Sequence, residues 1–369
     1  MTKQKIYLSI VFLILIAVMA MGCPPLKEES TIGLDWTERY VPGPMKADDL
    51  VSIAVSADGA KLAVADFYGD IRMSSDGGVS WKTATTLGQH NWKAIVSSSD
   101  GLKIAACTEY DDYIYISSNG GEVWQQCADL GAKSWEDIAI SSDGMNIFAI
   151  SSDNDKIIYK SGDGGISWTE KTIPYNVLGK KAVAVSSDGQ TIIFAPSVGY
   201  LFLSINGGLN WSEISANGDK CWCDVAISSD GNRIYAVSTT ASLELGRIYT
   251  SADKGQTWSV FNEPTDPSGK FKNIVTSNNG QKIVANKTNE ADICVSNDNG
   301  DSWNYISSTS LSEFANGNSA IAIAGDGSRI LVADTYLYNS SNNGNTWSEI
   351  TNVGPDRDWR AVAVSNNGQ

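Results

Sequence analysis

Histidine is almost absent from this sequence: His90 is the single histidine among 369 residues. That scarcity excludes a metal site built from several histidines and leaves a histidine-based catalytic triad without support. Proline is also scarce, with 9 residues, and there is no long low-complexity run. With 42% hydrophobic residues, the chain has enough apolar material for a large folded core.

Cysteines are few and scattered, and one of the six, Cys23, lies in the N-terminal segment. The other five do not form the paired spacing of a disulfide framework. The Cys-Trp-Cys stretch at 221–223 has no second pair at the spacing of a zinc site. We therefore expect no structural metal and no other cofactor. The five are Cys107, Cys127, Cys221, Cys223 and Cys294.

Positive charge is in deficit. Lysine and arginine total 27 against 42 acidic residues, which gives a formal net charge of −15. An acidic balance of this size argues against nucleic acid as a partner and against electrostatic docking on anionic lipid. It favours solubility and cationic partners.

The N-terminus has the layout of a targeting segment. Lys3 and Lys5 precede an apolar run from Ile6 to Met21, which is short for a stable membrane span. The run ends in Ala-Met-Gly-Cys at 20–23 and resembles a bacterial lipobox, although lipoboxes prefer leucine where Ala20 stands. The resemblance implies a signal peptide over 1–22, a diacylglyceryl anchor on Cys23, a tether over 23–32 and an extracytoplasmic place on a bacterial membrane, at the cell surface or in the periplasm. The alternative is an ordinary secretory signal in which Cys23 is incidental.

An octapeptide pattern, Ser-x-Asp/Asn-x-Gly-x-x-Trp, recurs seven times, with its tryptophans 43–47 residues apart. A fixed period of about 20–50 residues indicates a repeat architecture. The third position of the pattern is occupied by Asp76, Asn119, Asp163, Asn206, Asp253, Asp298 and Asn342.

Each period also carries a second half, such as Ile-Ala-Val-Ser-Ala-Asp-Gly at 53–59 followed by Lys-Leu-Ala-Val-Ala at 61–65. An Asp-Gly or Asn-Gly pair between two β-branched runs predicts a hairpin, for which we expect a type I′ turn. With two further short strands around the octapeptide, each period makes one four-stranded antiparallel blade, A to D. No segment shows sustained helical periodicity. The prediction is an all-β propeller with seven complete blades from about Leu50 to Ile350.

Part of a further unit remains at each end. Gly33 to Tyr40 reads as a lone strand D containing Trp36, and Trp359 to Gln369 reads as a lone strand A with its turn. Together they predict a split, partial eighth blade in a single propeller domain over 33–369, truncated at the C-terminus. The alternative is a closed seven-bladed ring with extra terminal strands.

The seven octapeptides resemble Asp-boxes, or BNR repeats, and the chain as a whole resembles the YVTN/BNR-like class of bacterial surface lipoproteins over 33–369. The resemblance implies that the Asp and Asn residues of the octapeptide fix hairpins on the rim, away from any ligand. Sialidases share these repeats but also use an arginine cluster and an Arg-Ile-Pro motif. The nearest matches here are Arg233-Ile-Tyr and Arg329-Ile-Leu, on the wrong face. Photosystem II assembly factors also share the repeats, but that family presents a basic patch and this chain is acidic.

Two groups of residues are candidates for ligand binding. The first opens strand A at the expected mouth of the propeller, where aromatic rings could stack on a sugar or grip a peptide; the alternative is packing between blades. The second lies in the B–C loops of blades one and two, where the alternative is a solvated acidic surface. The first group is Trp92, Trp135, Trp222, Phe271 and Trp359, and the second is Asp66, Tyr68, Tyr110 and Asp111.

These observations favour a membrane-anchored, monomeric propeller that binds or scaffolds a protein or a cell-surface polysaccharide without catalysis. The alternative is a propeller glycoside hydrolase of sialidase-like or xyloglucanase-like type, because 42 acidic residues offer many pairs of carboxylates.

Overall fold

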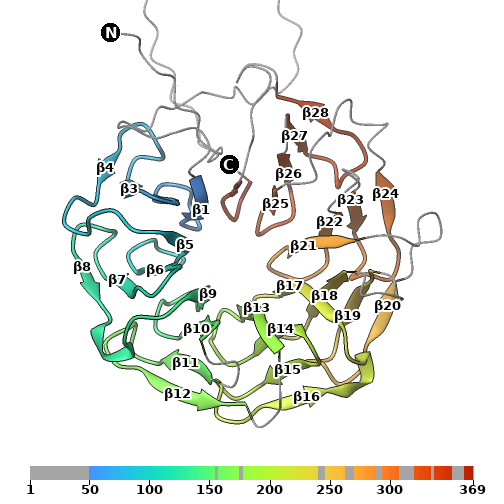
Figure 1. Cartoon of the computed structure of the whole chain (residues 1–369). Coiled ribbons are helices and arrows are strands. Elements are labelled where there is room, and N and C mark those ends of the chain that lie inside the picture. The colour runs from blue at the N-terminus through green and yellow to red at the C-terminus, as the bar shows by residue number, and fades with distance from the viewer. Residues whose placement is uncertain are drawn as a thin grey trace, which may run out of the picture.

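The computed structural model describes residues 50–153, 157–173, 178–239, 246–261, 270–287, 293–306, 320–333, 336–350 and 361–368. They form seven four-stranded antiparallel sheets that stand around a common axis (Figure 1). The prediction of seven complete blades in an all-β propeller is confirmed. Cys23, Trp36 and Trp359 lie outside the described residues.

Blades 1 to 4 follow the chain order, and each runs from its innermost to its outermost strand. Their strands are β1 Leu50–Val55, β2 Leu62–Asp66, β3 Ile71–Ser74 and β4 Lys82–Thr83; β5 Trp92–Ser97, β6 Ile104–Thr108, β7 Ile114–Ser117 and β8 Trp124–Gln126; β9 Trp135–Ile140, β10 Ile147–Ser151, β11 Ile157–Ser161 and β12 Thr169–Thr172; β13 Leu178–Val185, β14 Ile192–Val198, β15 Leu201–Ser204 and β16 Ser212–Ile214.

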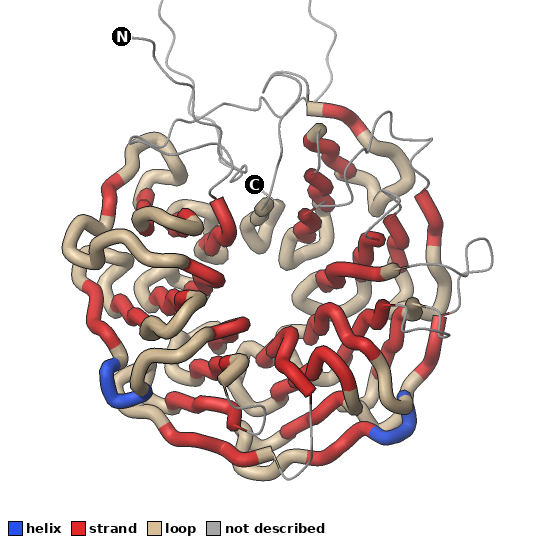
Figure 2. Tube along the Cα trace, viewed as in Figure 1, coloured by secondary structure: helices blue, strands red, loops and turns tan. Residues whose placement is uncertain are grey.

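Blades 5 to 7 continue the same order, and two short 3₁₀-helices lie at the outer edge of the ring (Figure 2). The strands are β17 Cys221–Ile227, β18 Ile234–Thr239, β19 Ile248–Ser251 and β20 Ser259–Phe261; β21 Phe271–Thr276, β22 Ile283–Lys287, β23 Ile293–Ser296 and β24 Asn304–Ile306; β25 Ala320–Ile323, β26 Ile330–Ala333, β27 Leu337–Ser340 and β28 Ser348–Glu349. The helices are η1 Ala128–Leu130 and η2 Ser215–Asn217. Neither is long or apolar enough to cross a membrane, and the same holds for every helix among the described residues.

The core is a ring of separate clusters, each lying between two neighbouring blades. Strands such as β2 and β6 are buried along their whole length, because each blade is covered on both faces. In blades 2 to 7, the tryptophan of the octapeptide packs into the cluster shared with the preceding blade: Trp124 joins side chains of blades 1 and 2, and Trp168 those of blades 2 and 3. The octapeptide therefore joins the blades to one another as well as shaping its own hairpin.

The A–B turn differs from the predicted type I′ hairpin. In blade 3, the Gly144 N–H donates to the Ser141 carbonyl at 2.9 Å, and only Gly144 of the Asp143-Gly144 pair has a positive φ, of 73°. Asp143 accepts from the Ser141 hydroxyl at 2.6 Å and from the Met145 N–H at 2.9 Å. These side-chain bonds hold a longer loop of type I character with glycine at its last position. The type I′ prediction is wrong because serine and aspartate, rather than two left-handed residues, close the turn.

Backbone hydrogen bonds join the A–B turns into a closed ring. The Ala57 N–H donates to the Ser99 carbonyl at 2.8 Å, and the same link continues from blade to blade. Residues 361–368 take one further place in this ring, between blades 7 and 1: the Asp326 N–H donates to the Asn366 carbonyl, and the Asn366 N–H donates to the Ala57 carbonyl. The ring of turns thus has eight places, of which seven belong to complete blades. The strand D predicted at Gly33 to Tyr40 lies outside the described residues.

The fold has two different faces. On the turn face, the A–B and C–D turns of one blade bond to each other, as when the Gly120 N–H donates to the Leu102 carbonyl at 2.8 Å. On the loop face, the B–C loop of one blade pairs with the segment entering the next, as in the bridge between Gly69 and His90. These names, turn face and loop face, are used below.

Candidate binding surface

The octapeptide turns use their polar groups internally. Asp163 accepts from the Ser167 N–H at 2.9 Å and from the Ser161 hydroxyl at 2.8 Å. In all seven turns the Asp or Asn at the third position accepts the backbone N–H four residues later. Hydrogen bonding, above all from the Ser167 hydroxyl, lowers the pKa of Asp163 to about 2, and the Ser80 hydroxyl does the same for Asp76. These residues hold the turn face together.

The predicted ring of aromatic side chains at the opening of strand A is buried. Trp92 and Trp135 have no exposed surface, and Trp222 and Phe271 are 2% and 1% exposed. A ring enclosed on both faces cannot stack on a sugar or peptide, so the prediction of a ligand platform is wrong for these four. The alternative reading, packing between blades, describes them.

The buried tryptophans instead hold the loops of the loop face. The indole N–H of Trp92 donates to the Gly69 carbonyl at 3.0 Å, and that of Trp135 donates to the Asp112 carbonyl at 3.1 Å. Trp222 makes the same bond to the Gly199 carbonyl at 2.8 Å. Each reaches back to the B–C loop of the preceding blade, and a buried indole N–H requires such a partner. The tryptophans therefore position the loops that face solvent.

Two of those loops, in blades 1 and 2, bring a group of side chains together that we call the aromatic patch: Phe67, Tyr68, Tyr110 and Asp111. Tyr68 is 63% exposed and Tyr110 57% exposed. The Phe67 ring contacts Tyr68 edge-on at 4.4 Å between centroids, and Tyr110 at 6.5 Å. Exposed tyrosines grouped across two blades are the kind of surface that recognition uses.

The backbone under this patch is strained. Tyr110 and Asp111 have φ values of 63° and 53°, so two consecutive non-glycine residues adopt the left-handed conformation. The left-handed conformation costs about 1–2 kcal/mol for such a residue. Bulky residues such as tyrosine adopt it more rarely than aspartate does. Strain of this kind gathers at functional sites, where the surrounding structure enforces it.

The charged groups around the patch are mostly paired. Asp66 is 3% exposed and forms an ion pair with the buried Arg72, which corrects the prediction that Asp66 faces a ligand. Lys93 pairs with Glu109 at 3.3 Å. Asp111, by contrast, is exposed and has no charged partner in the described part of the chain.

His90 is fixed between the two loops. Its Nδ1 lies 2.5 Å from the Asp112 carboxylate, and its Nε2 lies 2.8 Å from the Leu87 carbonyl oxygen. Both ring nitrogens therefore face oxygen atoms that can accept a hydrogen bond. The one histidine of the chain is thus a brace for the loop face.

Sequence reasoning missed two carboxylates on the inner strands. Asp137 accepts from the Ile138 N–H at 2.8 Å and, across the blade boundary, from the Val183 N–H at 2.9 Å. Asp224 repeats this with the N–H groups of Val225 and Ile274. Both follow a β-bulge two residues after a tryptophan. The one available signal was an aspartate where blades 2 and 4 have alanine, at 94 and 182.

Burial raises the pKa of both carboxyl groups, to about 6 for Asp137 and about 7 for Asp224. The backbone N–H donors act in the opposite direction and are outweighed. These groups link blade 3 to blade 4 and blade 5 to blade 6. Within the described residues, no cluster of three or more histidine, cysteine, aspartate or glutamate side chains has the geometry to hold a metal ion.

A family model described as photosynthesis system II assembly factor YCF48 matches residues 122–289, less than half of the chain. No curated protein matches this chain. With the seven blades, the family match supports a BNR-type propeller.

Solved structures show the same architecture. The Dos1 propeller covers 87% of this chain and 88% of its own, at 13% identity and a TM-score of 0.64. An ancestral GH74 enzyme covers 82% of this chain at 17% identity and a TM-score of 0.61, and this chain spans 46% of that enzyme. A structure of YCF48 bound to a D1 peptide covers 83% of this chain and 82% of its own, at 15% identity and a TM-score of 0.47. At such low identity the first two likenesses establish the fold alone.

Proposed function

We propose that this protein is a non-catalytic binding module that engages a polypeptide partner through the aromatic patch on its loop face. One observation carries the proposal: Tyr68 and Tyr110, on two blades, are both exposed and both contact the Phe67 ring, and Tyr110 lies on strained backbone. The match to the family of an assembly factor is consistent with a propeller that binds protein. A polypeptide is favoured over a glycan because the tryptophans that would have formed stacking platforms are buried.

The patch does not favour hydrolysis. A glycosidase needs two carboxyl groups free to act on one bond. Here Asp66 is paired with Arg72, Glu109 with Lys93 and Asp112 with His90, which leaves Asp111 as the exposed carboxylate of these loops. The surroundings of the patch thus support binding.

We further propose that Cys23 carries a lipid anchor that places the propeller on the outer side of a bacterial membrane. The support is the charged, apolar and Ala-Met-Gly-Cys sequence of residues 1–23. Expression of the full chain in a bacterial host with radiolabelled palmitate should label it, and Cys23→Ser should abolish the label. Equal labelling of both forms would contradict the anchor.

The binding proposal is tested with the full chain against a displayed peptide library and a panel of oligosaccharides, with a reducing-sugar assay in parallel. Enriched peptides should lose at least tenfold in affinity to the double variant Tyr68→Ser/Tyr110→Asn. Tyr110→Asn suits the left-handed backbone. Tyr200→Ser, in the corresponding loop of blade 4, is the matched control and should bind normally.

Each other result has a meaning. If the protein retained oligosaccharides and no peptide, the ligand would be a glycan and not a polypeptide. Release of reducing sugar would overturn the non-catalytic role. If peptide affinity were unchanged in the double variant, the peptide would bind at a site other than the aromatic patch.

A further inference from the structure

The turn face carries exposed aliphatic side chains in blades 1 to 4. They occupy equivalent places in the repeats. In blades 1, 3 and 4 one such side chain directly follows the second glycine of the octapeptide, and in blade 2 it comes one residue later. In blades 2 and 3 another follows the Asp-Gly pair of the A–B turn. Exposed fractions run from 40% to 72%. We call this set the aliphatic arc: Val79, Leu102, Val123, Met145, Ile166 and Leu209.

Blades 5 to 7 are polar at the same places. Directly after the single glycine of their octapeptides they carry Gln256, Asp301 and Asn345, all exposed. The A–B turns of blades 5 and 6 carry Asn232 and Gln281, also exposed. Single exposed aliphatics are normal on a protein surface. Six of them confined to four consecutive units, at places that the other three units fill with polar residues, make a distinct surface.

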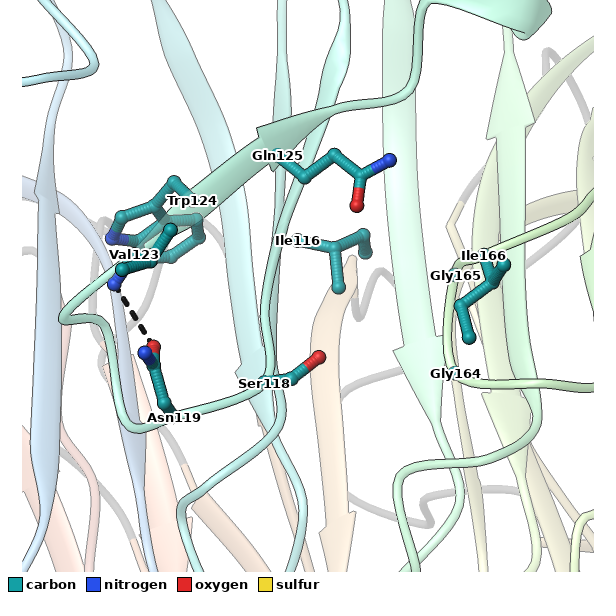
Figure 3. A pocket seen from close by; sticks show the side chains of 9 residues that line it. All are labelled: Ile116, Ser118, Asn119, Val123, Trp124, Gln125, Gly164, Gly165 and Ile166. Atoms are coloured by element: carbon teal, nitrogen blue, oxygen red, sulfur yellow. Dashed lines mark hydrogen bonds between the residues drawn. The ribbon is translucent and has the colours of Figure 1, made fainter.

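Three members of the arc, Leu102, Val123 and Ile166, line grooves between the blades. A groove of about 260 Å³ lies between blades 2 and 3, with Val123 and Trp124 on one side and Ile166 on the other; Ile116 lies between them (Figure 3). A second groove, of about 410 Å³, lies between blades 1 and 2 and is lined by Met73 and Leu102 among others. The two grooves share the lining residues Ser118 and Asn119, so they lie next to each other across three blades.

The surface is also rigid. The Met145 carbonyl accepts a hydrogen bond from the Gly164 N–H at 2.9 Å, which joins the A–B turn of blade 3 to the octapeptide of the same blade. Asp163 holds the other side of that octapeptide, next to Ile166. A pre-formed surface loses little entropy when it binds a partner.

Charge selects the partner. The turns of blades 1 to 4 carry more carboxylates than lysines. Hydrogen bonds, above all from Ser80 and Ser167, hold the pKa of Asp76 and Asp163 at about 2, so these groups stay ionised. Two of the lysines already donate to backbone carbonyls of a neighbouring turn, Lys61 to Asp100 and Lys103 to Gly164. The carboxylates are Asp58, Asp76, Asp100, Glu122, Asp143, Asp163 and Asp188, and the lysines are Lys61, Lys82, Lys103 and Lys160.

We infer that the aliphatic arc is a docking surface for a basic, amphipathic polypeptide segment whose aliphatic side chains enter the grooves between blades 1, 2 and 3. Its lysines or arginines face the turn carboxylates. A second copy of this chain would bring acidic turns against acidic turns, and an anionic lipid surface would be repelled by them. This surface lies opposite the aromatic patch and is independent of it.

The test uses the full chain and a labelled extended peptide of alternating leucine and lysine, followed by fluorescence anisotropy at 150 mM salt. The triple variant Val79→Ser/Val123→Ser/Ile166→Ser should weaken binding at least tenfold without changing the net charge. The matched control is Gln256→Ser/Asn345→Ser, at the same turn place in blades 5 and 7, and should bind as the parent does. The same peptide with glutamate for lysine should not bind.

Three results would overturn the inference. The first is equal binding by the triple variant and the control, which would mean general attraction to an acidic protein. The second is concentration-dependent dimerisation in sedimentation that the triple variant abolishes, which would make a second copy the occupant. The third is retention on zwitterionic vesicles that depends on Ile166, which would make the occupant a lipid surface. A normal peptide affinity of Tyr68→Ser/Tyr110→Asn keeps this test separate from that of the aromatic patch.

Discussion

The turn face and the loop face are made by the same seven repeats, yet one is nearly identical from blade to blade and the other is not. On the turn face, each octapeptide closes with the same bond from the Asp or Asn at its third position to an N–H four residues on, and each A–B turn bonds to the next. On the loop face, the B–C loops differ from blade to blade, and a buried tryptophan supports those of blades 1, 2 and 4. The repeat fixes one face for stability and leaves the other free to vary.

The largest expected effect contrasts one glycine from each face. A Cβ at Gly144, on the turn face, would lie 2.6 Å from the Lys103 Cβ, in a residue with a φ of 73°. Gly88, on the loop face, has a similar φ of 77° but no atom near its would-be Cβ. We expect Gly144→Ala to lower the free energy of unfolding by about 3 kcal/mol, and Gly88→Ala by about 1 kcal/mol.

Urea unfolding of the two alanine variants measures this difference. If both variants lost the same free energy of unfolding, the Lys103 side chain would be shown to move aside for the new Cβ at Gly144. The two glycines would then differ in no respect beyond their shared backbone strain.

The second prediction uses carboxylates with opposite pKa shifts. Asp137 and Asp224 have pKa values raised to about 6 and about 7, while Asp76 and Asp163 are lowered to about 2. A raised folded-state pKa contributes stability at low pH, and that stability is lost as pH rises through the folded-state value. The stability of the protein should therefore increase from pH 8 to pH 5, by an amount on the order of 2 kcal/mol. The turn carboxylates contribute nothing in this window, because their stability is lost only when the pH falls from about 4 toward 2.

Urea midpoints at a series of pH values test the prediction, with Asp137→Asn/Asp224→Asn as the comparison. The double variant should lose most of the slope between pH 8 and pH 5, whatever its absolute stability. An unchanged slope would mean that other groups carry the pH dependence.

The third prediction concerns the octapeptide carboxylate itself. Asp163→Ala removes an acceptor of backbone and hydroxyl donors and should cost about 1–2 kcal/mol of unfolding free energy. Asp163→Asn should cost less than about 0.5 kcal/mol, because Asn119 makes the same backbone bond in blade 2. Thermal unfolding of both variants decides the matter, and a large loss with asparagine would show that the negative charge is needed.

The sequence allowed the fold to be predicted because its signals are local: the octapeptide and the strands around it lie within one period. The site depended on contacts between periods. Trp92 is buried by neighbouring blades, and Asp137 bonds to Val183, 46 residues away. Tyr68 and Tyr110 were identified as candidates, but the left-handed backbone of Tyr110 and Asp111 has no signature in the sequence. The split eighth blade remains a prediction: its ring place is occupied by residues 361–368, while Gly33 to Tyr40 lie outside the described residues.

The smallest expected effect has the opposite sign and belongs to the loop face. Tyr110 has a φ of 63°, a conformation that asparagine adopts more readily than tyrosine. Its contact with Phe67, at 6.5 Å between centroids, is a modest one to lose. Tyr110→Asn should therefore raise the free energy of unfolding by about 0.5 kcal/mol while it weakens binding of the partner. A replacement on the turn face, such as Gly144→Ala, has no such gain. A loss of more than about 1 kcal/mol in urea unfolding of Tyr110→Asn would mean that the tyrosine supports the loops, and the strain would then no longer indicate a binding role.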